Sequence, residues 1–317
     1  MKSKLLVLFT LMILFLVMVC SVFSFQKYSP KNLLSLIKKP EPAKASILFT
    51  GDLMMDRYIR QVAMQNSHGY NFSLENVKDL FSSKDLVVSD LECPITTNKS
   101  LSIYSKVGSR NNFIFTCDPL VVDTLESHKI KMVNIGNNHI LNQGTSGLEQ
   151  TKRYLDERGI SYFDGNTSAI KDINGIKIGF AGYNQFSGDT ESKSKTIEEL
   201  KQLRTSVDIV VVYTHWGNEY QSISSTETQE LARRFIDAGA DVVIGSHPHV
   251  IQQIEDYKGK KIYYSLGNFV MDQYFSAETQ KGMLVEMNVT KKDNNVEVDF
   301  TEQYVKMLPT TQTILAK

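Results

Sequence analysis

Short hydrophobic runs alternate with amphipathic segments along most of this chain, and this alternation is typical of α/β proteins. Runs rich in Val, Ile and Leu predict buried strands, whereas apolar positions spaced three and four apart predict helices that cover a sheet. Strands are predicted over 46–52, 85–92, 130–136, 208–214 and 241–245. Helices are predicted over 74–83, 118–129, 146–158, 196–203 and 226–238.

Two segments depart from this alternation of strand and helix. Residues 172–183 hold an Asn174-Gly175 turn between alternating residues, which predicts a hairpin. The end of the chain predicts three strands in succession, over 260–270, 282–290 and 295–305. These strands favour an antiparallel extension, so the pattern predicts an α/β domain with a mixed sheet.

Polar side chains stand at the ends of the predicted strands. In open α/β sheets, ligands bind beyond the carboxyl ends of the strands, so these side chains are expected at one edge. Four of the six histidines follow this pattern, whereas His68 and His128 have ordinary loop and helix-end positions. The group consists of Asp52, Asp90, Glu92, Asn138, His139, His215, His247 and His249.

This group indicates a metal-binding enzyme site. Imidazole, carboxylate and amide groups without thiolate suit manganese, zinc or iron better than calcium. Asp90 and Glu92 alternate on one strand face, so one can bind metal while the other is structural. Asp52 alone could equally cap a helix or turn. For Asp56 and Arg57, a surface ion pair and a functional role are equally open.

Composition narrows the function only slightly. The chain is 42% hydrophobic and 22% charged with a formal net charge of zero, which gives no electrostatic case for nucleic-acid binding. Of three cysteines, Cys93 and Cys117 could pair, but their spacing matches no disulfide framework. Free or buried thiols are the favoured interpretation.

The N-terminus predicts a membrane signal. Lys2 and Lys4 precede an uncharged stretch whose apolar length approaches the ~20 residues that span a bilayer. An uncleaved anchor over 1–26 is favoured over a cleaved signal. A Pro-containing, Lys-rich linker over 27–44 then precedes a domain over 45–310. We therefore expect a single-pass cell-membrane protein. Its N-terminal helix would span the membrane, and its domain would lie outside the cell.

Several motifs in order make the chain similar to the CapA family, the poly-γ-glutamate capsule biosynthesis proteins. The resemblance covers about residues 45–305 and places the chain near the calcineurin-like metallophosphoesterase superfamily. The motifs are Gly51-Asp52 with Asp56-Arg57, Asp90-Leu91-Glu92-Cys93-Pro94, Asn137-Asn138-His139, His215-Trp216-Gly217, Gly245-Ser246-His247-Pro248-His249 and Ser265-Leu266-Gly267-Asn268-Phe269.

The resemblance implies a metallophosphoesterase-like β-sandwich flanked by helices, with a divalent metal centre at the strand ends. His139, as the substrate-contacting residue of the Asn-His pair, and Arg57 are the catalytic candidates it suggests. The implied metal ligands are Asp52, Glu92, Asn138, His215, His247 and His249.

The chain departs from the family pattern at four positions. Met54 occupies the place of a second ligand after the first aspartate, and Glu92 replaces a bridging aspartate. Asp90 and Asn142 stand where Asn and Asp are usual. The first metal site could therefore be built differently.

Three functions follow from the resemblance. The first is synthesis or export of a poly-γ-glutamate-type capsule polymer, with the γ-glutamyl-type polymer as substrate and membrane-bound synthase components as partners. The second is a metal-dependent hydrolase of a phosphoester or amide bond in an envelope polymer. The third is a non-catalytic assembly partner, for which the loss of a ligand at Met54 is the argument.

Overall fold

The computed structural model describes residues 12–18, 20 and 41–316. It separates a unit over Met1–Pro42, in which 12–18 are helical, from a compact unit over Ala43–Lys317. Among the described residues, none of the helices combines the length and the apolar character needed to cross a membrane. The anchor over 1–26 and the linker over 27–44 lie largely outside the described residues and stay predictions.

The first sheet is built around β1 (Ala43–Leu53). On one side of β1 the strands run parallel to it, in the order β2 (Leu86–Leu91), β3 (Ile130–Asn134) and β4 (Ser161–Phe163). On the other side lie the antiparallel strands β12 (Lys281–Lys292), β13 (Asn295–Met307) and β14 (Thr313–Leu315). The short strand β11 (Asn268–Val270) pairs with the end of β1.

The second sheet centres on three parallel strands, β6 (Ile176–Asn184), β7 (Ile209–His215) and β8 (Val242–Ser246). The predicted hairpin is confirmed, because β5 (Ala169–Ile173) pairs antiparallel with β6. At the other edge, β10 (Lys260–Tyr263) and β9 (Ile254–Tyr257) extend the sheet. Both sheets therefore contain parallel strands whose ends carry the polar residues noted in the sequence.

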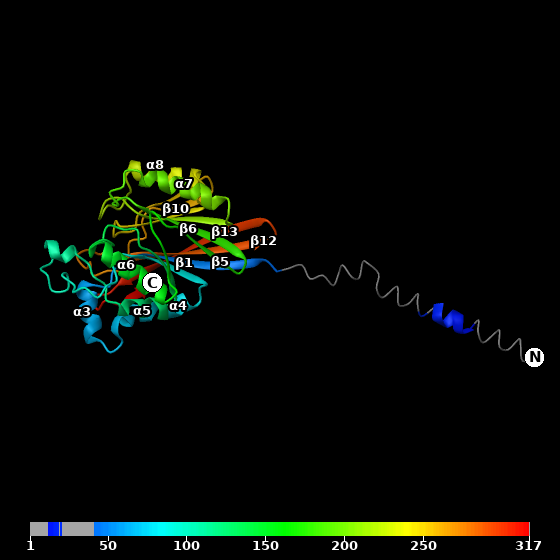
Figure 1. Cartoon of the computed structure of the whole chain (residues 1–317), viewed down its shortest axis with the longest axis horizontal. Helices are drawn as coiled ribbons and strands as arrows, with labels where there is room; N and C mark the ends of the chain where they lie inside the picture. Colours follow the sequence, from blue (N-terminus) through cyan, green and yellow to red (C-terminus); the bar gives the residue numbers. More distant parts are fainter. Residues whose placement is uncertain (1–11, 19, 21–40, 317) are drawn as a thin grey trace, which may run out of the picture. The chain divides into compact units, whose positions relative to one another are not determined.

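Helices cover the outer faces of the two sheets (Figure 1). Against the first sheet pack α3 (Arg57–Gln65), α4 (Lys78–Ser82), α5 (Leu120–Ser127) and α6 (Gly144–Glu157). Against the second pack α7 (Ser192–Arg204) and α8 (Thr226–Asp237). Within the described residues, three 3-10 turns lie at Gly69–Ser73, Glu75–Val77 and Arg110–Phe113.

Strand alternation explains why the molecule forms two sheets rather than one. Ile47 and Phe49 of β1 enter a core shared with the second sheet, while Leu48 between them packs under the helices of the first sheet. In the same way Val211 of β7 faces the shared core and Val210 faces α7 and α8. Successive strand residues point to opposite faces, so strands that are apolar at every position need cover on both sides.

Several element predictions need correction. Residues 74–83 form the turn Glu75–Val77 and the short α4 rather than one helix. Residues 260–270 are two strands in different sheets, because β10 joins the second sheet and β11 the first. Helix α3 is missing from the prediction, although Ile59, Val62 and Ala63 have the spacing of an amphipathic helix. The expected single mixed sheet is therefore a sandwich, as the family resemblance implied.

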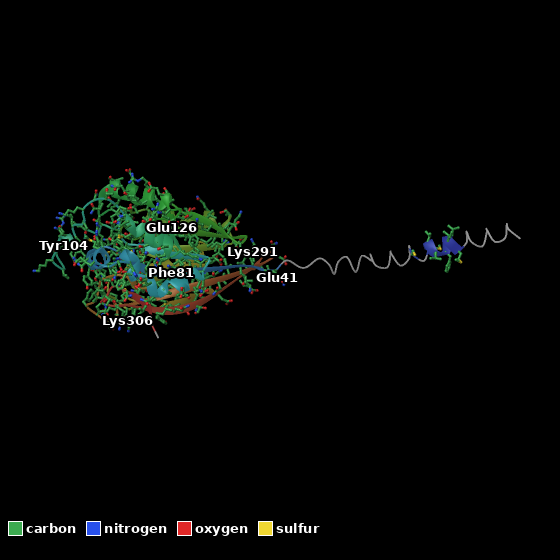
Figure 2. All side chains as sticks on the ribbon, turned by 90° about the horizontal axis from the view of Figure 1, so that it is seen from below. Glu41, Phe81, Tyr104, Glu126, Lys291 and Lys306 are labelled. Atoms are coloured by element: carbon green, nitrogen blue, oxygen red, sulfur yellow. A yellow bond between two sulfur atoms is a disulfide. The ribbon has the colours of Figure 1, made fainter. Side chains whose placement is uncertain are left out.

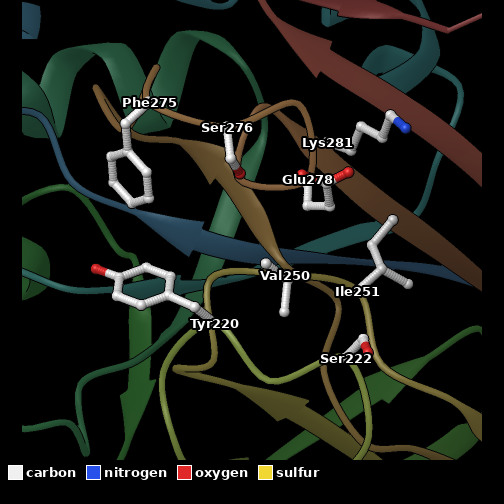
Figure 3. Close-up of a pocket in the computed structure, with 8 residues that line it drawn as sticks. All are labelled: Tyr220, Ser222, Val250, Ile251, Phe275, Ser276, Glu278 and Lys281. Atoms are coloured by element: carbon white, nitrogen blue, oxygen red, sulfur yellow. The ribbon is translucent and has the colours of Figure 1, made fainter.

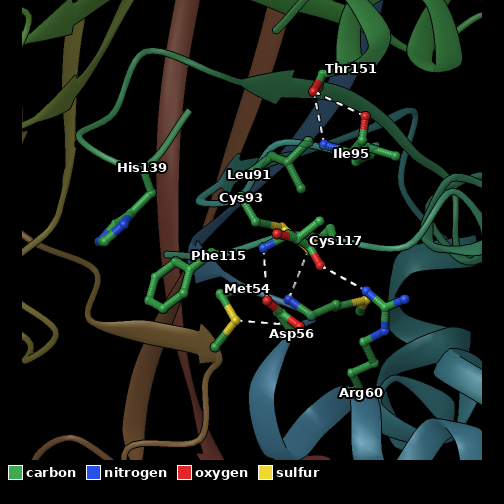
Figure 4. Close-up of a disulfide and its surroundings, with 12 residues drawn as sticks. Met54, Asp56, Arg60, Leu91, Cys93, Ile95, Phe115, Cys117, His139 and Thr151 are labelled. Atoms are coloured by element: carbon green, nitrogen blue, oxygen red, sulfur yellow. Dashed lines mark hydrogen bonds between the residues drawn. A yellow bond between two sulfur atoms is a disulfide. The ribbon is translucent and has the colours of Figure 1, made fainter. Parts of the chain in front are cut away.

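A disulfide joins Cys93 and Cys117, so the interpretation as free thiols is wrong (Figure 4). Both sulfurs are buried, and the Met55 N–H donates to Cys117 Sγ at 3.3 Å. A parallel bridge between Ile95 and Cys117 sets the two chain segments side by side. Sequence spacing could not reveal this long-range contact. The bond closes the loop 94–116, from which Tyr104 projects at the surface (Figure 2).

Reduction of this disulfide should lower the stability of the domain. With a sequence separation of 24 between the cysteines, loop-closure entropy predicts a loss of about 3 kcal/mol in the free energy of unfolding. Urea denaturation of the compact unit, oxidised and reduced, measures the difference. Identical midpoints in the two states would show that this bond does not stabilise the fold.

Candidate metal centre

The parallel strands bring their polar ends together at one site. β1 supplies Asp52 near its end, and Glu92 directly follows β2. β7 ends at His215, while β8 ends at Ser246 and is followed by His247 and His249. The side chains of these five predicted ligands are all buried.

Two glycines let the backbone approach closely beneath the site. A Cβ at Gly51 would lie 1.8 Å from the Gly267 carbonyl oxygen, and one at Gly245 would lie 2.1 Å from that of Tyr264. Neither position can accept a side chain without displacing backbone. The glycines therefore set where Asp52 and the turn after β8 stand.

Among the described residues, four sets of ligand atoms are close enough to share an ion, and two of these sets contain Glu92. In each set the atoms lie within 4.8 Å of one another. One set is Glu92, His215 and His247, and the other is Asp52, Glu92 and His249. Asn138 Oδ1 lies 2.7 Å from His215 Nε2, which adds an amide oxygen to the first set. Glu92 belongs to both sets and stands where a bridging carboxylate would.

Glu92 provides the test of whether a cation fits. Its carboxylate is fully buried, yet neither oxygen has a hydrogen-bond partner among the described residues. Burial, the largest effect, raises the pKa of Glu92 to about 8. An unpaired buried carboxylate is costly, and coordination of a cation is one of the few ways to satisfy it. The donors present therefore fit a divalent metal.

Asp90 supports the centre from behind. Its carboxylate lies 2.6 Å from His215 Nδ1 and accepts a hydrogen bond from Ser246 Oγ, also at 2.6 Å. Asn134 Nδ2 donates to its other oxygen at 2.9 Å. Because Nδ1 is occupied, His215 Nε2 is left facing Asn138. A carboxylate behind a histidine ligand commonly fixes its tautomer in this way.

The turn after β8 holds two histidines in strained backbone conformations. His247 and His249 have φ angles of 95° and 57°, and Pro248 stands between them. Such left-handed residues persist where the surroundings fix them, often at functional sites. Although burial opposes it, the carboxylates of Glu92 and Asp52 raise the pKa of His249 to about 9. Burial, aided by the charges of His215 and His249, lowers the pKa of His247.

His139 lies at the rim of the centre with a defined tautomer, and its side chain is next to Phe115 (Figure 4). Its Nε2 is 3.8 Å from Glu92 Oε1, and its ring stacks on Phe115 at 4.1 Å between centroids. Asn142 Oδ1 lies 3.0 Å from His139 Nδ1 and also accepts the Phe115 N–H at 2.7 Å. The proton therefore sits on Nδ1, and Nε2 faces the centre as an acceptor. Burial lowers the pKa of His139 to about 4.

Replacing Asn142 by Asp should raise the pKa of His139. A carboxylate in contact with Nδ1 favours the imidazolium, with an expected upward shift of roughly 1–3 pKa units. NMR titration of the metal-free domain measures the shift. A pKa of His139 that stays near 4 in Asn142→Asp would contradict the contact between these residues.

The open choice between a surface pair and a functional role for Asp56 and Arg57 is resolved against the surface pair. Both are buried, and they do not pair with each other. Asp56 accepts hydrogen bonds from the Ser100 and Ser102 hydroxyls and from the Thr116 N–H. Asp56 is therefore a structural residue that holds the loop 94–116.

Arg57 lies between the loop and the rim of the centre. It forms an ion pair with Asp272, and its guanidinium lies over the Phe115 ring at 4.9 Å. Within the described part of the chain, its buried Nε has no hydrogen-bond partner. Arg57 thus retains one free donor next to the ring that supports His139.

The structure adds residues that the strand-end pattern did not identify. Asn268 Oδ1 lies 2.9 Å from His249 Nδ1, and Asp272 holds Arg57. Glu219 forms a further candidate set with His247 and His249. The Ser-Leu-Gly-Asn-Phe motif pointed to Asn268 without a role. Glu219 follows the His215-Trp216-Gly217 motif by only two residues, which was the one available signal.

A cavity of about 520 Å³ is lined by Tyr220 and by Val250, the residue after His249 (Figure 3). The Tyr220 ring on its wall is 6.0 Å from the His249 ring and 5.3 Å from that of Phe275. The remaining lining residues are Ser222, Val250, Ile251, Ser276, Glu278 and Lys281. The wall is largely apolar with two charged groups, as small-molecule and polymer sites often are.

Comparison with known proteins finds similar chains among solved structures and among curated sequences. A solved Thermus thermophilus protein, TT1561, overlaps 80% of this chain and 98% of its own, with 11% identity and a TM-score of 0.44. "PGA biosynthesis protein CapA" of Bacillus subtilis (strain 168) is 32% identical over 266 residues, covering 78% of this chain and 68% of the relative.

A second relative and a family model agree with this match. "Capsule biosynthesis protein CapA" of Bacillus anthracis is 27% identical over 285 residues, covering 83% of this chain and 67% of that protein. The model of "Bacterial capsule synthesis protein PGA_cap" matches residues 46–273, which include all the predicted site residues. The family predicted from the motifs is thereby confirmed: the chain belongs to the bacterial capsule synthesis proteins of the PGA_cap family.

Proposed function

We propose that this chain is a membrane-anchored, metal-dependent component of the synthesis or export of a poly-γ-glutamate-type capsule polymer. Family membership and the names of the two relatives support the capsule role. The single observation that carries a metal-dependent activity is the unsatisfied Glu92 carboxylate among His215, His247 and His249. The substrate proposed is the γ-glutamyl-type polymer, and the proposed partners are membrane-bound synthase components.

The donor set favours manganese, zinc or iron. Glu92, Asn138, His215 and His247 would hold one ion, and Asp52, Glu92 and His249 would hold another. A bound ion would supply Lewis-acid polarisation of a carbonyl or phosphoryl oxygen.

The residues at the rim would handle protons and position the substrate. His139 Nε2 is an acceptor at the pH of the cell surface, because its pKa lies near 4. It would take a proton from an attacking group and return it to a leaving group. The Arg57 guanidinium, which Asp272 and Phe115 fix, would place a positive charge beside the substrate.

The reaction proposed is cleavage or transfer at an amide bond of the polymer, with a phosphoester as the second candidate. The apolar wall formed by Tyr220 and Phe275 supports the amide, because it would accommodate the methylene groups of a γ-glutamyl chain. Lys281 at the same cavity would meet a carboxylate of the polymer.

A hydrolysis assay tests this proposal. The compact unit over 43–317, loaded with Mn²⁺, Zn²⁺ or Fe²⁺, should act on γ-glutamyl polymers in a metal-dependent manner. Phosphoesters assayed in parallel separate the two candidate reactions. Absence of turnover on both substrate classes by a metal-loaded domain would favour the non-catalytic assembly partner.

Topology is tested separately in whole cells. If residues 1–26 form an uncleaved anchor with Lys2 and Lys4 inside, external protease should degrade the domain while the N-terminal segment stays with the membrane. A cytoplasmic protein of known location serves as the protection control. Recovery of the intact chain in the soluble cytoplasmic fraction would contradict both the anchor and the envelope role.

A further inference from the structure

One of the two ligand sets is short of donors. Asp52, Glu92 and His249 together offer three ligand atoms, whereas the metals favoured here take at least four ligands. Met54 lies two residues after Asp52, directly past the end of β1. Met54 is fully buried, and its sulfur lies 3.0 Å from the Asp56 N–H. A thioether is a poor ligand for manganese or zinc, so this position does not complete the set.

Glu219 lies beside His247 and His249. Its carboxylate oxygen and one ring nitrogen each of His247 and His249 lie within 4.8 Å of one another. Glu219 is exposed, whereas the other ligands are buried: Asp52, Glu92, His215, His247 and His249. It belongs to the loop that leaves β7, not to a strand end.

The loop carrying Glu219 is fixed on both sides. The Gly217 N–H donates to Gln185 Oε1 at 2.9 Å, and the Tyr220 N–H donates to the Pro248 carbonyl at 2.8 Å. The second bond ties the loop directly to the turn that carries both histidines. Tyr220 itself has a φ angle of 62°, a conformation that costs free energy for a non-glycine residue.

Aromatic contacts hold Tyr220 in this conformation (Figure 3). Its ring faces Phe275 edge-on and lies beside His249. The residue before Tyr220, Glu219, is thereby placed next to the turn that holds His247 and His249.

We propose that Glu219 is an additional carboxylate ligand for a divalent cation, closing the side of the centre that His247 and His249 leave open. This inference rests on the proposed metal centre. The ion class is that of manganese, zinc or iron, for which a mixed set of carboxylates and imidazoles is suitable. Because Glu219 is exposed, it is also the ligand that a substrate entering from the Tyr220 cavity meets first.

The test compares Glu219→Gln with the parent in the purified full chain. Calorimetric titration with Mn²⁺ and with Zn²⁺ should show at least one ion bound roughly tenfold or more weakly. Glu230→Gln, an exposed glutamate on α8, is the matched control and should titrate like the parent. The metal-free melting temperature should be equal in all three proteins, because Glu219 is exposed.

The outcomes separate this inference from the function on which it rests. Unchanged affinity in Glu219→Gln, with metal lost in His247→Ala/His249→Ala, would overturn the role of Glu219 and leave the metal centre intact. Equal weakening in Glu230→Gln would also overturn it, as a general effect of surface charge. A parent protein that binds neither ion would overturn both.

Discussion

His247→Ala/His249→Ala should lower the transition-metal content of the purified chain from about one ion or more per molecule to background. The substitutions remove imidazoles from both ligand sets that share Glu92. The remaining carboxylates bind these metals weakly without nitrogen donors. Elemental analysis after purification in defined metal measures the content directly.

His68→Ala is the matched control, because His68 is exposed and pairs with Glu75. Neither residue belongs to a candidate ligand set. This control should retain parental metal content. The double variant should also remain folded, since the sheets are unchanged and Phe186 and Tyr220 still pack beside the two positions. Parental metal content in a folded double variant would show that the ligand assignment is wrong.

His139→Ala should reduce turnover, or polymer production in cells, by on the order of 10²- to 10⁴-fold. Its Nε2 faces Glu92 as an acceptor, while Asn138 beside it takes part in the ligand set. Metal content should equal that of the parent. The melting temperature should fall by only a few degrees, because the substitution chiefly removes the stacking of the imidazole on Phe115.

The same variant separates an enzyme from an assembly partner. Asn142→Ala removes the oxygen that keeps a proton on His139 Nδ1, but it leaves the imidazole ring in place. It should therefore reduce turnover less than His139→Ala does. Full polymer production by His139→Ala at parental protein levels would favour the non-catalytic assembly partner. Loss of metal in His139→Ala would instead make His139 a ligand.

The strand-end residues could be predicted because they follow local rules. β7 reads as a continuous apolar run that ends at His215, and β8 does the same before His247. A parallel sheet then delivers these ends to one edge without further information. Asp52 and Asn138 also stand at predicted strand ends, and the family motifs then implied that both are metal ligands.

The features that local patterns do not predict depend on contacts between distant segments. Cys93 meets Cys117 only because the loop 94–116 folds back on β2. The role of Asp90 follows from a contact with His215 in the other sheet. Glu219 reaches the histidines through a loop whose conformation is fixed by Pro248 and Gln185, which no local pattern encodes.

Crystallography of the Mn²⁺- or Zn²⁺-loaded domain, with data collected on both sides of the metal absorption edge, tests the central claim most directly. If Glu92 binds the metal, an anomalous peak should lie within coordination distance of a Glu92 oxygen and of a His215 or His247 nitrogen. A loaded crystal in which Glu92 still has no cation beside it, with the metal bound elsewhere, would contradict the account.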